Sequence, residues 1–325
     1  MFFTAGPKLT GENDFGDDKV QIGSPERAKW LVQQYKERGF DFIKTYAGMP
    51  GDILNAIIEQ SEISDISIIT HPSFKIPYQN NFHLQIATIE HAEDIVQQAL
   101  HYELDSTKLE SVVEQYVISG KSFSPTLTGY YKIFEMLEDS TVLKSDQVKY
   151  INPLMCKFDS EVQFARWVNE KRTNPSISEI ILKQHKFHLY ILNELNKAGV
   201  NIVCSTDAGI GITAPGYSIH QELDFYSQSG LSNYEVLKTA TVNPSRAHHE
   251  MELLGTIEKG KWANFILTDG NPLENLSTLR EPLWVMVQGR KIGQETLNEF
   301  EDKAYNRKNF IATAIRWVEY ILVEK

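Results

Sequence analysis

The stretch that decides the fold is the apolar run Val200-Asn201-Ile202-Val203-Cys204, followed at once by Ser205-Thr206-Asp207-Ala208-Gly209. The run predicts a buried strand, so Asp207 stands at its carboxyl end, and a glycine opens the loop behind it. Enzymes built as (β/α)8 barrels place their chemistry at this end of the strands. A carboxylate there suits a metal ion or a general base. An ordinary turn aspartate is the plainer alternative.

Strands and helices alternate along most of the chain, which is the pattern of a parallel α/β sheet. Helix signals accompany this pattern: Ser24 and Pro25 predict an N-cap and a first helical position, and Gly39 predicts the end of the same helix. Beyond residue 252, short apolar runs between turns predict a small second sheet, and residues 311–323 predict a final helix. The expected strands lie near residues 1–5, 40–46, 66–70, 86–90, 122–127 and 201–206.

The composition is that of an ordinary globular protein and argues against several classes of function. Hydrophobic residues make up 42% and charged residues 23% of the 325 residues. The net charge of −11 argues against a nucleic-acid partner, because phosphate binding needs basic patches. No apolar run approaches the ~18 residues of a membrane-spanning helix. Two cysteines, Cys156 and Cys204, do not make a disulfide framework, and a cytoplasmic location is the default expectation.

Three further side chains stand on expected strands or directly after them. His71 follows Ile68-Ile69-Thr70, and His91 follows Thr88-Ile89-Glu90 one unit later. We expect both imidazoles at the same edge, and neutral imidazole is a favoured zinc ligand. Lys44 lies among apolar residues, where burial of an ammonium ion is costly. The alternatives are hydrogen-bonded structural histidines and a lysine whose stem extends to the strand end.

Four motifs in the second half of the chain point to a known family. They are Ser205-Thr206-Asp207-Ala208-Gly209, Gly216-Tyr217-Ser218-Ile219-His220-Gln221-Glu222-Leu223, Ala240-Thr241-Val242-Asn243-Pro244-Ser245 and the run from Gly255 to Phe265. At these residues the chain resembles the amidohydrolase superfamily of metal-dependent hydrolases, in its imidazolonepropionase-like and dipeptidase-like branch. The resemblance implies a (β/α)8 barrel of the TIM type with a small β-sandwich. It also implies one or two divalent metal ions, zinc by default, and hydrolysis of a carbon–nitrogen bond in a dipeptide, lactam or related amide.

The resemblance also implies roles for individual residues. Lys44 matches a lysine that carbon dioxide converts into a metal-bridging ligand, and His71 and His91 match metal-ligand histidines. Asp207 matches the aspartate that touches one metal and takes the proton of the attacking water. All four residues are therefore expected at one metal site.

Two other residues are expected near the substrate. His220 is interpreted as a substrate contact or a supporting residue, and an ordinary helix-cap histidine is the alternative. Tyr130 follows a predicted strand end and either shapes the substrate pocket or packs in the interior.

The His-x-His motif that opens the family's metal site does not occur in the sequence. We therefore expect an incomplete barrel, strands three to eight, over residues 1–252 and a β-sandwich remnant with a terminal helix over residues 253–325. An N-terminally shortened enzyme is the favoured interpretation, and a non-catalytic amidohydrolase-like binding or interaction protein or a different (β/α) enzyme are the alternatives. Unpaired strand edges predict low activity alone and a partner, either a second copy or a complementing N-terminal segment. An export signal on such a segment would change the expected location.

Overall fold

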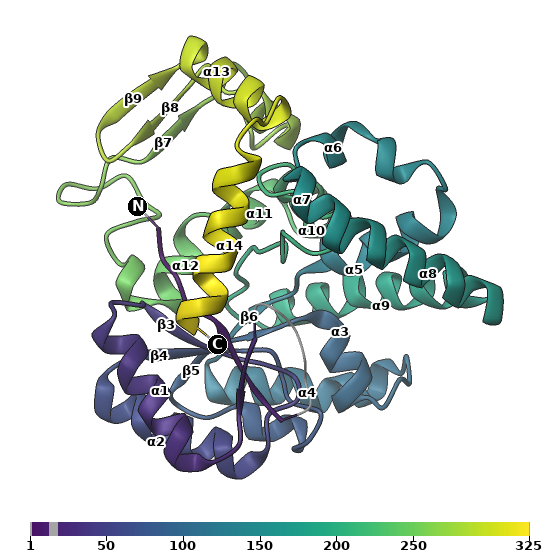
Figure 1. Ribbon diagram of the computed structural model, residues 1–325, viewed down its shortest axis with the longest axis vertical. Helices are drawn as coiled ribbons and strands as arrows, with labels where there is room; N and C mark the ends of the chain where they lie inside the picture. Colours follow the sequence, from purple (N-terminus) through teal and green to yellow (C-terminus); the bar gives the residue numbers. More distant parts are fainter. Residues whose placement is uncertain (1, 13–18, 325) are drawn as a thin grey trace.

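Short apolar runs form a parallel sheet of six strands, with the spatial order β2-β1-β3-β4-β5-β6. Figure 1 labels four of these strands, β3 to β6. The computed structural model describes residues 2–12 and 19–324. Leucine, isoleucine or phenylalanine side chains from all six strands are completely buried and form the centre of the core. They include Leu9, Ile22, Ile43, Ile68, Ile89 and Phe123. The strands are β1 Lys8–Gly11, β2 Lys19–Ile22, β3 Phe42–Thr45, β4 Ser67–Thr70, β5 Ile86–Glu90 and β6 Ser122–Ser124.

The first predicted strand is wrong. Within residues 1–5, Met1 lies outside the described part, and residues 2–5 form no strand. Instead the Thr4 carbonyl accepts hydrogen bonds from the backbone N–H groups of Asp41 and Phe42, and Gly6 turns the chain with a φ of +66°. The strand begins at Lys8, and β2, which the sequence analysis did not predict, pairs with it in parallel.

Two later strands are shorter than predicted. β6 ends at Ser124, before Pro125. Leu127, which was expected to close the strand, begins helix α5 (Leu127–Glu138). Of residues 201–206, only Ile202 pairs with the sheet, through a parallel bridge to Phe123. The direction of that bridge nevertheless continues the parallel arrangement.

The helices cover the sheet and follow the predicted capping signals closely. Ser24 accepts a hydrogen bond from the Arg27 N–H at 3.2 Å, and Gly39 has a φ of +83° beyond the helix end. Both observations confirm the prediction for α1. The helices are α1 Pro25–Glu37, α2 Gly51–Ser64, α3 Ala92–Asp94, α4 Ser106–Ser119, α5 Leu127–Glu138, α6 Asp146–Lys149, α7 Pro153–Met155, α8 Glu161–Thr173, α9 Ile177–Lys197, α10 Ser218–Gln228, α11 Asn233–Thr239, α12 Val242–Ala247, α13 Gln294–Tyr305 and α14 Phe310–Glu324.

A separate antiparallel sheet contains β7 Phe265–Leu267, β8 Trp284–Val287 and β9 Arg290–Gly293. β8 and β9 are joined by Gln288 and Gly289, both at positive φ, which is the backbone geometry of a tight hairpin turn. The final predicted helix is confirmed as α14. Among the described residues, no helix is both long enough and apolar enough to cross a membrane.

The register of the parallel sheet determines where functional side chains can meet. Thr45 pairs with Thr70, Thr70 with Ile89, and Glu90 with Ser124. The carboxyl ends of β3, β4, β5 and β6 are therefore nearly level. Residues directly after these strands emerge at one edge of the sheet.

Candidate active site

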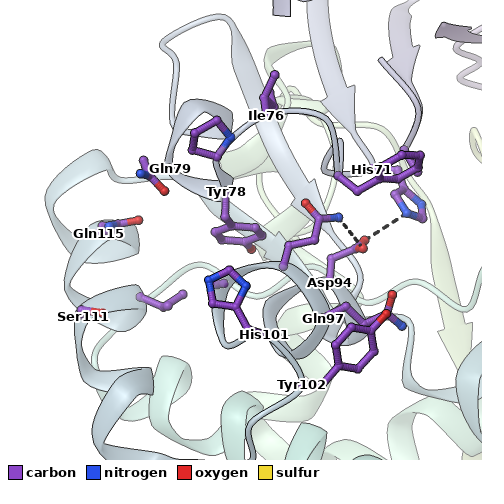
Figure 2. Close-up of a pocket in the computed structure, with 16 residues that line it drawn as sticks. His71, Ile76, Tyr78, Gln79, Asp94, Gln97, His101, Tyr102, Ser111 and Gln115 are labelled. Atoms are coloured by element: carbon purple, nitrogen blue, oxygen red, sulfur yellow. Dashed lines mark hydrogen bonds and ion pairs between the residues drawn. The ribbon is translucent and has the colours of Figure 1, made fainter. Parts of the chain in front are cut away.

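Two cavities lie beside this edge of the sheet, and both are bordered by His71. The larger has a volume of about 700 Å³ and extends past His71 and Asp94 toward Tyr78, His101 and Gln115 (Figure 2). The smaller has a volume of about 270 Å³ and is bordered by His71, His91 and Asp207. Because four of the predicted site residues border it, His71, His91, Tyr130 and Asp207, the smaller cavity is the candidate active site.

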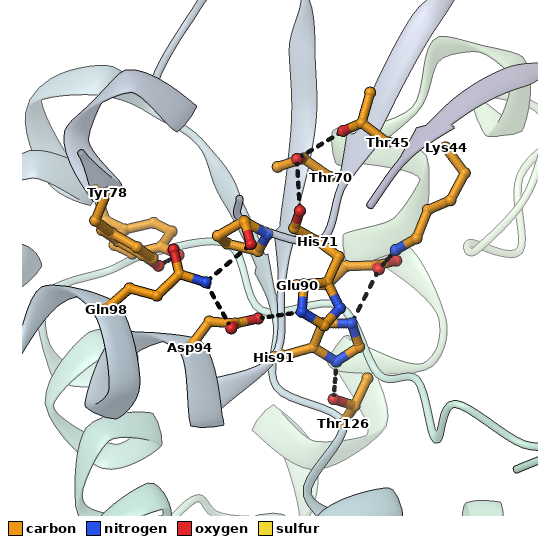
Figure 3. A network of polar contacts seen from close by, with 12 residues as sticks. Lys44, Thr45, Thr70, His71, Tyr78, Glu90, His91, Asp94, Gln98 and Thr126 are labelled. Atoms are coloured by element: carbon orange, nitrogen blue, oxygen red, sulfur yellow. Dashed lines mark hydrogen bonds and ion pairs between the residues drawn. The ribbon is translucent and has the colours of Figure 1, made fainter. Parts of the chain in front are cut away.

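The two predicted histidines lie next to each other at the strand ends (Figure 3). His71 follows β4 and His91 follows β5, and the centres of their rings are 4.3 Å apart. Burial lowers the pKa of His91 well below its ordinary value, and the neighbouring His71 and Lys44 lower it further. His91 is therefore neutral near pH 7, which is the state in which imidazole binds a metal ion.

In each histidine, a neighbouring oxygen holds one ring nitrogen. His91 Nδ1 is 2.7 Å from the hydroxyl oxygen of Thr126, and His71 Nε2 is 3.1 Å from the carboxylate of Asp94. His71 Nδ1 is buried and has no hydrogen-bond partner in the described part of the chain. His91 Nε2 lies 3.6 Å from Glu90 Oε2. Metal-binding histidines have this arrangement, in which an oxygen fixes the ring and leaves the other nitrogen for the ion.

Asp94 offers a second ligand arrangement. His71, His91 and Asp94 each place a ligand atom within 4.8 Å of the others, close enough to hold one ion between them. However, Asp94 Oδ2 lies 3.1 Å from His71 Nε2, at ion-pair distance, and Asp94 Oδ1 accepts a hydrogen bond from Gln98 at 2.8 Å. One imidazole nitrogen cannot donate to a carboxylate and bind an ion at the same time. We therefore favour the arrangement in which Asp94 orients His71 and leaves Nδ1 for the ion.

Lys44 lies at the same edge, on β3, and its ammonium group contacts Glu90 (Figure 3). Burial lowers the pKa of Lys44 to about 7; Lys8 adds to this effect, while Asp207 and Asp94 oppose it. A large fraction of the amine is therefore unprotonated near neutral pH. Only an unprotonated amine has the lone pair that reacts with carbon dioxide, so the environment is compatible with the carboxylation expected from the resemblance.

Asp207 stands in the loop behind the Ile202 bridge. Its φ of +50° is uncommon for a residue other than glycine, and such a conformation persists only where the surroundings hold it. The hydroxyl group of Ser205 contacts that of Ser124 on β6, which ties this loop to the end of the sheet. The loop thereby presents Asp207 to the cavity that His71 and His91 border.

A buried glutamate from α10 fixes the first turn of α5. Glu222 is completely buried and accepts hydrogen bonds from the backbone N–H groups of Leu127 at 2.9 Å and Thr128 at 2.6 Å. Burial raises the pKa of Glu222 to about 7, although these N–H groups act in the opposite direction. Thr126, which holds His91, directly precedes this turn and has a φ of +51°. Glu222 thus supports the backbone that orients His91.

The other predicted residues occupy different positions. Tyr130 borders the smaller cavity and also packs against His188, so both interpretations of this residue describe part of its surroundings. His220 is half-buried on α10 near Asp224 and Arg280, and it is not on the wall that the described residues form around the smaller cavity. Its contact with substrate stays a prediction.

Sequence reasoning missed the residues that hold the histidines. Asp94 stands three positions after His91, about one helical turn, and this spacing could have indicated that Asp94 lies near the histidines. Thr126 and Glu90 carried no such signal, because a threonine after a proline and a glutamate at a strand end are common. Their importance depends on contacts between different strands, which the register creates.

Sequence comparison finds two kinds of match. A sequence model described as "Amidohydrolase family" matches residues 135–292. Ochratoxinase from Aspergillus niger is 35% identical over 97 residues, which are 29% of this chain and 19% of that enzyme. The matched segment thus spans about a fifth of the length of the curated relative.

Comparison with solved structures shows the same fold over most of the chain. A bottromycin amidohydrolase matches with a TM-score of 0.71 and 17% identity, covering 93% of this chain and 67% of that chain. The A. niger ochratoxinase gives 0.61 and 17%, covering 92% and 69%. A Xaa-Pro dipeptidase with bound methionine gives 0.59 and 16%, covering 87% and 63%. At these identities the likeness concerns the fold alone.

Proposed function

We propose that this chain, which belongs to the amidohydrolase superfamily, carries out metal-dependent hydrolysis of a carbon–nitrogen bond in an amide, a peptide or a cyclic amide. The family match over residues 135–292 supports the reaction class. The observation that carries the proposal is the histidine pair: each ring has one nitrogen held by an oxygen, and both rings border the cavity that contains Asp207. A purely structural histidine pair would not need a carboxylate-bearing cavity beside it.

The site fits a divalent metal ion, because His71 Nδ1 is a buried polar atom without a partner in the described residues. We propose His71 Nδ1, His91 Nε2, Asp207 and a carboxylated Lys44 as ligands, a set of nitrogen and oxygen atoms that suits zinc. When bound, the ion would act as a Lewis acid and lower the pKa of a water molecule toward neutrality. Asp94 and Thr126 keep the two imidazole rings oriented for this role.

Proton transfer falls to Asp207 in this proposal. Its carboxylate oxygen accepts the proton of the attacking water and then donates it to the nitrogen that leaves. Tyr130 forms part of the wall that positions the substrate. Because the cavity has a volume of only about 270 Å³, the substrate is expected to be a small amide such as a dipeptide or lactam.

We also propose that the parallel sheet belongs to a (β/α)8-type barrel over residues 1–252, with residues 253–325 forming a β-sandwich part and the terminal helix. The parallel bridge between Ile202 and Phe123 supports this, because it continues the sheet in the direction that closes a barrel. The TM-score of 0.71 to an amidohydrolase supports it as well.

A non-catalytic amidohydrolase-like binding protein is the second candidate. Two observations favour it: the sequence has no His-x-His pair, and Lys44 is in contact with Glu90, which stabilises the charged ammonium form. The two candidates differ in turnover and not in the ability to bind a small amide.

The test is to load the chain with zinc and measure zinc content and hydrolysis of a panel of dipeptides, N-acyl amino acids and lactams. The Asp207→Asn variant should lose turnover while the histidines still bind zinc. Asp224→Asn, which changes a half-buried aspartate of α10 that pairs with Arg280 outside the cavity wall, should behave as wild type and is the matched control. Zinc binding without turnover of any substrate would favour the binding protein, and absence of bound zinc would contradict the proposed site.

A further inference from the structure

We propose that the larger cavity is a separate binding site for a neutral, hydroxyl-rich ring compound, a small saccharide. Its volume of about 700 Å³ is in the range of small-molecule sites. His71 is the one described residue that borders both cavities. The inference therefore goes beyond the proposed function, because it concerns a different site.

The cavity lies at a gap in the helical layer beside the sheet. Helices of 14 residues, α2 and α4, stand between β3 and β4 and between β5 and β6. Between β4 and β5 the chain forms only one turn of 3₁₀ helix, Tyr78–Asn81. A parallel α/β arrangement ordinarily has a full helix at such a point. The cavity lies between this short connection and α4 (Figure 2).

Contacts within the protein hold the walls of the cavity in place. Tyr78 is buried, and its hydroxyl oxygen lies 2.9 Å from that of Tyr116, so the short connection is tied to α4. Gln98 Nε2 donates hydrogen bonds to the Pro72 carbonyl and to Asp94 Oδ1, both at 2.8 Å. These bonds tie the loop after β4 to the helical segment after β5. A site with walls that are already ordered loses less entropy when a ligand binds.

One buried hydrogen-bond acceptor on the wall is unused. Gln98 Oε1 is buried and accepts no hydrogen bond from the part of the chain that the structure describes. The orientation of this amide follows from its partners, because both Pro72 and Asp94 present acceptors and therefore require the nitrogen. A buried acceptor without a partner is costly, and a ligand with an O–H or N–H group would satisfy it.

The charges on the wall select a neutral ligand. No lysine or arginine borders the cavity in the described ranges, so an anion would find no such partner there. The Asp94 carboxylate is 2% exposed, and its oxygens already lie beside His71 Nε2 and Gln98 Nε2. A cation would therefore have to replace these contacts. An apolar ligand would leave Gln98 Oε1 without a partner.

Among neutral compounds, hydroxyl groups match the polar part of the wall. Four glutamine side chains border the cavity: Gln79, Gln97, Gln98 and Gln115. Figure 2 shows Gln79 and Gln115 on the side opposite to His71. A glutamine side chain offers both a donor and an acceptor, and so does a hydroxyl group.

Aromatic side chains supply the apolar part of the wall. Three of them border the cavity: Phe74, Tyr78 and Tyr102. Their rings offer a flat apolar surface to the C–H groups of a sugar ring, while the ring hydroxyls can reach the glutamines. The combination favours a saccharide over a charged or a purely apolar compound.

The experiment measures binding to the full chain by isothermal titration calorimetry, with a chelator present so that the result does not depend on the proposed metal site. The neutral probes are cellobiose, maltose and lactose. Cellobionate and the glucosamine disaccharide are the anionic and cationic counterparts of cellobiose. At least one neutral disaccharide should bind with a Kd of about 1 mM or lower, and the charged compounds should bind at least about 10-fold more weakly.

Variants locate the site. Gln115→Trp should weaken binding at least about 100-fold, because the larger side chain occupies the cavity from α4. Gln115→Leu and Gln98→Leu each remove one polar partner and should weaken binding about 2- to 10-fold. Ile118→Trp is the matched control: Ile118 lies on the same helix, is 77% exposed and borders neither cavity. It should leave the affinity unchanged, and circular dichroism would check that all four variants fold.

Three results would overturn the inference. The first is the absence of saturable binding by any of the neutral disaccharides. The second is equal affinity for cellobiose and its charged counterparts, which would show that the wall does not select a neutral ligand. The third is an equal loss in Gln115→Trp and Ile118→Trp, which would place binding outside this cavity.

Discussion

Replacement of Glu222 by alanine should strongly destabilise the fold, because this side chain caps α5 from another helix. The variant leaves the N–H groups of Leu127 and Thr128 buried without an acceptor. Each such group costs about 1–3 kcal/mol, so the free energy of unfolding should fall by about 2–6 kcal/mol. Glu222→Gln keeps one carbonyl acceptor and should lose about half as much.

The same residue predicts a pH dependence with a definite sign. Burial raises the pKa of Glu222 from 4.5 to about 7, so the folded state holds this proton more tightly than the unfolded chain. The stabilisation is complete below pH 4.5 and is lost as the pH rises through 7, and it corresponds to at most about 3 kcal/mol. Glu222→Gln does not titrate and therefore lacks this dependence.

Urea denaturation of wild type, Glu222→Ala and Glu222→Gln at pH 5.5, 7 and 8.5 measures both effects. The stability of the wild type relative to Glu222→Gln should decrease with rising pH. A Glu222→Ala variant within 1 kcal/mol of wild type, or a relative stability that increases with pH, would refute the reasoning.

Three further predictions concern single side chains. Thr126→Val should weaken zinc binding about 10- to 100-fold by releasing the His91 ring, measured by competition with a chelator; unchanged affinity would argue against this orienting role. In ¹³C NMR with labelled bicarbonate, Lys44 should give a carbamate signal that grows from pH 6 to pH 8, because the pKa of Lys44 is about 7. A signal that persists in Lys44→Gln would show that the carbamate forms at another residue. Gly255→Ala should destabilise the fold more than Gly120→Ala. Both glycines have positive φ, which costs alanine about 1–2 kcal/mol. Of the two, only Gly255 would place a Cβ 2.5 Å from a backbone oxygen. Equal losses on urea denaturation would contradict that difference.

The sequence was sufficient where a feature depends on neighbouring residues. The N-cap at Ser24 and the left-handed Gly39 are local features, and the structure confirms both. The ends of the strands before His71 and His91 could also be predicted from the sequence, because each histidine directly follows an apolar run. In a parallel sheet such ends meet at one edge, so the common cavity with Asp207 agrees with the expected geometry, while the roles of these residues stay predictions.

The sequence was insufficient where the structure of a segment depends on contacts with residues far away in the chain. Residues 2–5 have the composition of a strand, but the hydrogen bonds of Thr4 with Asp41 and Phe42 place this segment beside the start of β3 and outside the sheet. Residues 19–22 form β2 only because β1 offers them an edge. Helix α8 forms part of the wall of the smaller cavity, and Asp159 just before it is bonded to Gly211, about 50 residues away, a contact that no local pattern reports.

The central claim is that an ion binds between the two histidines on the side of Asp207. Crystals of the zinc-loaded chain, measured at the zinc absorption edge, would locate the ion directly by anomalous scattering. We predict a peak about 2.0–2.1 Å from both His71 Nδ1 and His91 Nε2, with the Asp94 carboxylate still beside His71 Nε2. A peak coordinated by Asp94 and His71 Nε2, or no peak at this edge of the sheet, would contradict the account.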